Sequence, residues 1–386
     1  MKPIVSPGRV VGLDVARALA LVGMMATHIL PDLDLDGVTL SHQLASGRAS
    51  ALFAVLAGVS IALMSGRTAR QRGRELAATS AGLAVRALLI AVIGLLLGEV
   101  DSGIAVILAY YGVLFLLAIP FLGLRAPALA ALAAIWVVVA PVASHLLRPR
   151  VPPASYDVPA FGSLRDPWQL LTELSFTGYY PAVPWLAYVL VGMALGRTAL
   201  ASWRTTAAVG LVGAGTALAS WAVSEMLLDR GGVRGTLAET FTGPGDQGAI
   251  ALTLDRGLYG TAPTGSWWWL VVTTPHTGTP FDLAHTIGTS LLVIAVSVAL
   301  GRLAPRLMAV VFGAGAMTLT LYTAHVVARS EGLWDGHDPG TFVGQVVVVL
   351  LIGAAYRLGR QRGPLETAVG SVQSAVRRAA AGTPQT

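Results

Sequence analysis

The stretch GLDVARALALVGMMATHIL, residues 12–30, decides how this sequence folds. It is apolar and long enough to cross a bilayer, because roughly 20 apolar residues span the hydrocarbon. Yet it contains Asp14, Arg17 and His28, charged or titratable side chains that lipid penalises by several kcal/mol. On a helix these three residues share one stripe, which runs for about 21 Å at 1.5 Å per residue. The stripe predicts a membrane helix buried among other helices, beside a polar path.

The composition indicates an integral membrane protein. Hydrophobic residues make up 54% of the 386 residues and charged residues 12%, whereas soluble domains contain about 25% charged residues. The net charge is +6, but the arginines stand in short clusters between apolar segments, which indicates membrane orientation and excludes a nucleic-acid partner. The sequence contains no cysteine, so disulfides and thiolate ligands are excluded.

Ten segments are long and apolar enough to cross a membrane, which predicts an all-α, polytopic bundle of about ten transmembrane helices. The short loops on the N-terminal side hold most of the arginines, so the positive-inside rule places both termini in the cytoplasm. We therefore expect a membrane domain over residues 1–358 and a basic cytoplasmic tail over 359–386. The expected spans are 11–31, 48–66, 78–99, 103–123, 127–147, 180–197, 206–226, 281–301, 307–328 and 342–358.

With this topology, all seven histidines fall in the outer half of the membrane or outside it. Longer outer loops explain part of this bias, but His28, His285 and His325 close or open three different spans at one depth. This clustering favours an outward-facing polar chamber with an imidazole as general base. The histidines show neither an HExxH pattern nor a helical ligand pair, so no metal is expected.

Five stretches carry a family resemblance. They are GLDVARALALVGMMATH, GRASALFAVLAGVSIALMSGR, ILAYYGVLFLLAIPFLGL, PHTGTPFDLAHTIGTSLLVIAVSVAL and GAGAMTLTLYTAHVV. Together they resemble the bacterial heparan-α-glucosaminide N-acetyltransferase-like family, part of a superfamily of transmembrane acyltransferases that modify extracytoplasmic glycans. The resemblance covers most of residues 9–328 and implies a multi-pass enzyme of the plasma membrane.

The resemblance also implies two co-substrates and two candidate bases. Acetyl-CoA or another acyl-CoA would bind on the cytoplasmic side, and an extracytoplasmic glycan or small acceptor would bind outside. His28 matches the polar residue that closes the first span of the family, because it lies the same distance after Arg17. His42 is the nearest match to the catalytic histidine of the following loop, and this precedent favours His42 as the base, with His28 as the alternative.

Three charged residues in the early spans are candidates for binding the donor. Arg17 could hold the phosphates of CoA, since guanidinium groups suit phosphate geometry. Alternatively, Asp14 and Arg17, three residues apart, form a structural ion pair. Arg86 lies inside the span 78–99 and needs a partner, which is either Asp14 or the donor.

The outer ends of the spans supply candidates for the acceptor side. Arg48 would bind an anionic acceptor or stabilise an oxyanion, or else anchor its helix at the interface. His276 and Trp268 precede the span 281–301; a tryptophan stacks on sugars or belongs to an aromatic belt at the interface.

Two pairs with a spacing of three residues are further catalytic candidates. Asp282 would orient His285 or cap the helix, and Tyr322 and His325 would line the same chamber.

These features favour an acyltransferase that moves an acetyl or other short acyl group across the membrane to an external acceptor. The alternative is a multispan transporter or exporter of a small or anionic solute, which buried charges also suit. Against a transporter, the sequence shows no matched pair of broken spans in two related halves. A membrane scaffold would have no use for the charged stripe. The oligomeric state stays open.

Overall fold

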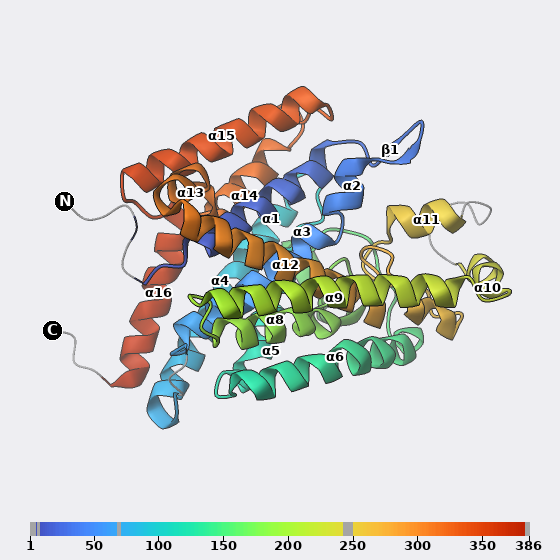
Figure 1. The fold of residues 1–386 in the computed structure, drawn as a ribbon, viewed down its shortest axis with the longest axis horizontal. Coiled ribbons are helices and arrows are strands. Elements are labelled where there is room, and N and C mark those ends of the chain that lie inside the picture. Colours follow the sequence, from blue (N-terminus) through green and yellow to red (C-terminus); the bar gives the residue numbers. More distant parts are fainter. Residues whose placement is uncertain (1–4, 6–7, 68–70, 242–249, 383–386) are drawn as a thin grey trace.

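Helix α1, Val11–Ile29, lies inside the helical bundle of the computed structural model (Figure 1). The structure describes residues 5, 8–67, 71–241 and 250–382. Most residues of α1 are buried, and the helix contacts the third, twelfth and fifteenth helices. This central position gives the charged stripe of α1 protein neighbours instead of lipid.

Over the described residues the fold is helical apart from one two-stranded hairpin, in which β1 (Leu33–Asp34) pairs antiparallel with β2 (Gly37–Val38). The helices of the first half are α2 (Leu40–Ala45), α3 (Arg48–Met64), α4 (Gly73–Gly98), α5 (Leu108–Ala118), α6 (Ala126–Leu147), α7 (Pro167–Thr172) and α8 (Ala182–Gly196). Those of the second half are α9 (Trp203–Leu228), α10 (Val233–Glu239), α11 (Ile250–Arg256), α12 (Pro280–Leu303), α13 (Pro305–Val311), α14 (Thr318–Ala328), α15 (Pro339–Leu358) and α16 (Pro364–Ala381). Short turns η1 (Ile119–Phe121), η2 (Arg148–Arg150), η3 (Phe161–Arg165), η4 (Glu173–Thr177), η6 (Trp267–Val271) and η7 (Gly313–Ala316) connect or extend them.

The prediction of a polytopic helical membrane protein is confirmed. Among the described residues, seven helices are long and apolar enough to cross a membrane. An eighth span results if α7 and η4 are joined to α8, to which they are bent by 51°.

The structure differs from the ten expected spans at two places. The segment 103–123 forms the short helices α5 and η1, and 307–328 is broken into α13, η7 and α14. At the break, Gly315 lies so close to the backbone oxygen of Asp14 that a Cβ atom would collide with it. Irregular backbone at membrane depth is stable only where protein covers it, as α1 does here.

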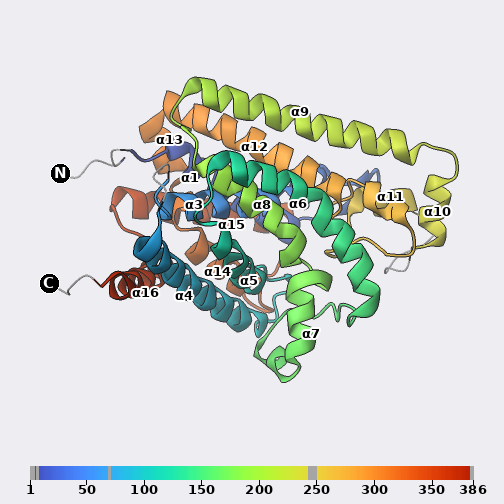
Figure 2. The same ribbon diagram turned by 90° about the horizontal axis from the view of Figure 1, so that it is seen from below.

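The start of α1 and α16 lie at the same end of the bundle (Figures 1 and 2), here called the α16 end. The opposite end, where α1 finishes at His28 and Ile29, is called the histidine end. The sequence predicted a tail after residue 358, and most of that segment forms α16, which packs along α4. Gly82 of α4 provides the space for Gln373 of α16.

Close helix crossings depend on glycine, as in many membrane bundles. Gly58 of α3 faces the backbone of Val189 in α8, and Gly192 of α8 faces the backbone of Val55 in α3. A Cβ at either glycine would overlap a carbonyl oxygen, so the two helices would have to separate. Gly58 stands four residues after Ala54 on α3, a spacing of small residues that is typical of close helix packing in membranes.

We expect Gly192→Leu to lower the melting temperature of the purified protein, because overpacking a helix contact costs about 1–3 kcal/mol. The matched control is Gly215→Ala in α9, where an added Cβ meets nothing within 4 Å. This control should leave the melting temperature unchanged or raise it slightly, since alanine favours helix. Equal destabilisation by both variants would show that the α3–α8 crossing is not the cause.

Candidate active site

The α16 end of the α1 stripe contains a cluster of ion pairs. The carboxylate of Asp14 is buried and accepts from Nε of Arg9 at 2.7 Å and from Nη1 of Arg17 at 3.0 Å. Nη2 of Arg17 donates to Oγ of Ser60 on α3, also at 3.0 Å. The ion pair that the spacing of Asp14 and Arg17 predicts is therefore present, and the buried charge of Asp14 is compensated.

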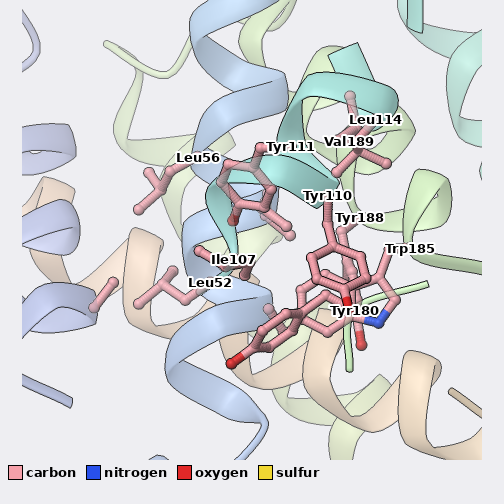
Figure 3. Close-up of a cluster of buried hydrophobic side chains, with 14 of the residues drawn as sticks. Leu52, Leu56, Ile107, Tyr110, Tyr111, Leu114, Tyr180, Trp185, Tyr188 and Val189 are labelled. Atoms are coloured by element: carbon pink, nitrogen blue, oxygen red, sulfur yellow. The ribbon is translucent and has the colours of Figure 1, made fainter. Parts of the chain in front are cut away.

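A cavity of about 200 Å³ lies beside this cluster and is here called the central cavity. Its wall is mainly apolar, with Arg17 among the lining residues. The hydroxyl of Tyr322 accepts from the backbone N–H of Ile107 at 3.3 Å. The hydroxyl of Tyr111 is buried and has no hydrogen-bond partner among the described residues. Figure 3 shows Tyr111 on the side of the aromatic cluster that carries Leu56 and Ile107, two further residues of the cavity wall.

A second cavity, of about 660 Å³, adjoins the central cavity at the α16 end and is here called the basic mouth. Met64, Arg86 and Glu366 line both cavities. Nη1 of Arg86 donates to Oε1 of Gln373 on α16 at 3.4 Å. Asp14, one of the two partners considered for Arg86, is paired with Arg9 and Arg17 instead. Arginines from both chain halves line the mouth, namely Arg9, Arg86, Arg357, Arg360, Arg362 and Arg377.

The basic mouth has properties of an anion site. Nε and Nη2 of Arg357 are buried without a hydrogen-bond partner among the described residues. The single carboxylate in its wall, Glu366, is engaged elsewhere: it accepts from the backbone N–H of Leu319 at 2.7 Å and from Oγ1 of Thr320 at 2.6 Å. Glu366 thereby ties α16 to α14 and leaves the arginine charges available to a ligand.

At the histidine end, the half-buried His28 and the buried His325 and Gln345 form a hydrogen-bonded row. Nδ1 of His28 lies 3.1 Å from Nε2 of His325, and the two rings are nearly parallel at 11°. Nδ1 of His325 lies 2.8 Å from Oε1 of Gln345 on α15. Met24 and Tyr322, one turn before these histidines on α1 and α14, line the central cavity. The row therefore begins where the cavity ends.

His42 and His276 occupy separate positions near this row. His42 lies on α2, half-buried, with Nδ1 at 3.5 Å from Oγ1 of Thr39. Nε2 of His276 accepts from the backbone N–H of Gly47 at 3.1 Å, just before α3 begins. Burial lowers the pKa of His276 to about 4, so this imidazole is neutral and acts as a fixed acceptor.

Arg48 and His285 are connected, whereas Asp282 does not reach His285. Nη2 of Arg48 lies 3.1 Å from Nε2 of His285, and Nδ1 of His285 lies 3.0 Å from the carbonyl oxygen of Ala217. Oδ2 of Asp282 instead accepts from the backbone N–H groups that precede α12. Of the two roles predicted for Asp282, the carboxylate therefore does not orient His285; it binds the turn that leads into α12. Arg48 lines a polar groove of about 880 Å³ at the histidine end.

Trp268 lies away from the cavities described above. It forms part of η6 and packs on a small hydrophobic cluster that contains Trp269 and Phe241. Trp269 is fully buried, and its Nε1 donates to Oγ1 of Thr240. Trp268 therefore neither faces a cavity in which a sugar could stack on it nor belongs to an exposed aromatic belt. Its role is to pack the loops against one another.

Sequence reasoning missed Tyr111 and Gln345. Tyr111 stands beside Tyr110 in an apolar stretch, where aromatic residues usually mean core packing. Gln345 is the one amide in the valine-rich span of α15, and an uncharged polar residue at membrane depth was a signal for a buried partner. The arginines of the C-terminal segment were assigned to a tail because its packing on α4 is not visible in the sequence.

No group of three or more potential metal ligands occurs in the part of the chain that the structure describes. The fold defines a multispan membrane protein with two adjoining cavities beside α1. A family model for the heparan-alpha-glucosaminide N-acetyltransferase catalytic domain matches residues 9–224, more than half of the chain. The chain belongs to this family, whose catalytic domain implies acetyltransferase activity and acetyl-CoA as donor. A search of curated proteins returned no match.

We expect the unfolding free energy to fall as the pH drops from about 6.5 towards 4. The pKa of His276 is about 4 in the folded protein, and an unfolded histidine titrates near 6.5, so the unfolded state takes up the proton first. His276→Gln keeps a side-chain acceptor for Gly47 but cannot titrate. The variant should therefore lose less stability over this range in thermal melts in detergent. Identical pH dependence of both proteins would contradict this assignment.

Proposed function

We propose that this protein is an integral membrane acetyltransferase that takes acetyl, or a short acyl group, from cytoplasmic acetyl-CoA to an extracytoplasmic acceptor. One observation carries the proposal: the basic mouth, the central cavity and His28 follow one another along α1. The predicted orientation puts the α16 end in the cytoplasm, where acetyl-CoA occurs. The acceptor would then approach from outside, at the histidine end.

The residues of the two cavities fit the chemistry of the donor. The phosphates of the donor would bind the arginines of the basic mouth, including the unpartnered nitrogens of Arg357. The pantetheine arm would extend through the mainly apolar central cavity past Arg86 and Arg17. The thioester would then lie near Tyr111, whose free hydroxyl is suited to stabilise an oxyanion.

The transfer step assigns one role to each group. Nε2 of His28 takes the proton of the acceptor amine or hydroxyl as that group attacks the thioester carbonyl. The hydroxyl of Tyr111 donates to the carbonyl oxygen while it carries negative charge. The intermediate collapses, the C–S bond breaks, and the CoA thiolate takes the proton from the His28 imidazolium. The products are an acetylated acceptor and free CoA.

The polar groove supports an acceptor that carries hydroxyl or amine groups, such as a glycan. Arg48 and Thr274 line it, together with the carboxylates of Asp36, Glu225 and Asp255. These groups offer both donors and acceptors to a sugar. His42 lies next to this groove on α2 and is the alternative base, since the family resemblance favours a loop histidine.

The function is tested by incubating purified protein with radiolabelled acetyl-CoA and a panel of amino sugars and hydroxyl acceptors. We expect acetyl transfer to one class, and a loss of about 10²–10⁴ in kcat for His28→Gln at unchanged acetyl-CoA affinity. The control is His145→Gln, because His145 packs on Trp267 of η6. A loss for His42→Gln with normal turnover of His28→Gln would assign the base to His42. Absence of both transfer and acetyl-CoA binding would overturn the proposal and favour the transporter alternative.

We expect the double variant Arg360→Ala/Arg377→Ala to bind acetyl-CoA at least tenfold more weakly in calorimetric titration. Each charge-assisted hydrogen bond to phosphate contributes about 1.5–3 kcal/mol, and 1.4 kcal/mol is tenfold in affinity. The control is Arg306→Ala on α13, an exposed arginine at the same end of the bundle (Figure 1). Unchanged affinity of the double variant would remove the basic mouth from the donor site.

A further inference from the structure

Gln345 is an isolated polar side chain on a helix most of which faces outward. Its span in α15 is only 22% buried, yet Gln345 itself is 3% exposed and lies under the turn that follows α14. Burying an amide is unfavourable unless both of its ends are hydrogen-bonded. Both ends are: Nε2 donates to the carbonyl oxygen of Trp334 at 2.9 Å, and Oε1 faces Nδ1 of His325 at 2.8 Å.

The partner groups determine the direction of every hydrogen bond in this row. The carbonyl oxygen of Trp334 can only accept, so the amide nitrogen of Gln345 must point to it. The amide oxygen therefore faces His325, and Nδ1 of His325 must carry a proton. In a neutral imidazole the other nitrogen is then an acceptor, so Nε2 of His325 accepts. Nδ1 of His28 must in turn donate to it, because the two nitrogens lie 3.1 Å apart.

We infer that Gln345 is a positioning residue that sets the tautomer of the catalytic imidazole. Through His325 it keeps the proton of His28 on Nδ1 and leaves the lone pair on Nε2, the nitrogen that abstracts the acceptor proton. The assignment of His28 as the base rests on the proposed function, whereas the tautomers of the row stand on their own. Neither α14 nor α15 lies within the matched residues 9–224.

The other end of the row, at the carbonyl of Trp334, is held in place by a buried arginine. Nη1 of Arg329 donates to the carbonyl oxygen of Gly336 at 2.7 Å, and Nη2 lies 2.9 Å from Nε2 of His337. Arg329 is 3% exposed and packs inside the turn between α14 and α15. These contacts hold the turn that carries the carbonyl of Trp334. This end of the row is therefore a backbone group in a fixed position.

The direct test is nitrogen NMR of the full-length protein in detergent, with ¹⁵N-labelled histidine, at a pH where the imidazoles are neutral. The shifts of protonated and unprotonated ring nitrogens differ widely, and His28→Gln and His325→Gln assign the two residues. We expect both histidines of the wild type to carry the proton on Nδ1. In Gln345→Leu this preference should be lost for both. A wild-type His28 protonated on Nε2 would overturn the inference, whether or not the variant folds.

Kinetics provide the second measurement. Gln345→Leu should lower kcat about 10–100-fold, the range typical of residues that orient a functional imidazole, without changing the KM for acetyl-CoA. The control Gln169→Leu removes an amide from α7, and its kcat should match the wild type. Unchanged kcat in Gln345→Leu would contradict the positioning role. If the NMR result holds while His28→Gln stays active, the row is correct and the assignment of His28 in the proposed function fails.

Discussion

The buried carboxylate of Asp14 is the constraint on which the rest of the structure depends. A charge at membrane depth is stable only with partners, and these come from Arg9, Arg17 and, through Arg17, from Ser60 on α3. The same turn of α1 has the backbone of Gly315 against it, which breaks the span 307–328. Gly315, Ala316, Thr318 and Leu319 of this broken span line the central cavity, together with Arg17. The ion-pair cluster of Asp14 and the wall of the cavity are thus built from the same segments.

The site extends well beyond the part of the chain that defines the family. Residues 9–224 provide α1, α3, α4 and α5, which form much of the cavity wall. The hydrogen-bonded row needs α14 and α15, and the basic mouth needs α16. The later helices therefore supply the hydrogen-bonded partners of His28 and most arginines of the basic mouth, while the earlier helices enclose much of the central cavity.

Much of this could be predicted from the sequence, because hydropathy and helical periodicity are local signals. The stripe of Asp14, Arg17 and His28 correctly indicated a first helix that is buried among other helices. The pairing of His28 with His325 could not be foreseen, since they meet through tertiary packing of helices far apart in the chain. The contact between Asp282 and His285 does not form because the turn before α12 donates two backbone N–H groups to the carboxylate. The spacing of the two residues does not show this competition.

The packing of α16 along α4 has a consequence for how the protein becomes active. Arg9 stands before the first membrane helix, whereas Arg377 comes after the last one described, so the basic mouth is built from the earliest and the latest of these segments. A nascent chain can insert every membrane helix before the basic mouth is complete. Under the proposed function, donor binding would begin only once α16 has docked and Glu366 has bonded to Thr320. A partly synthesised chain would then pass through the insertion machinery without binding the proposed donor.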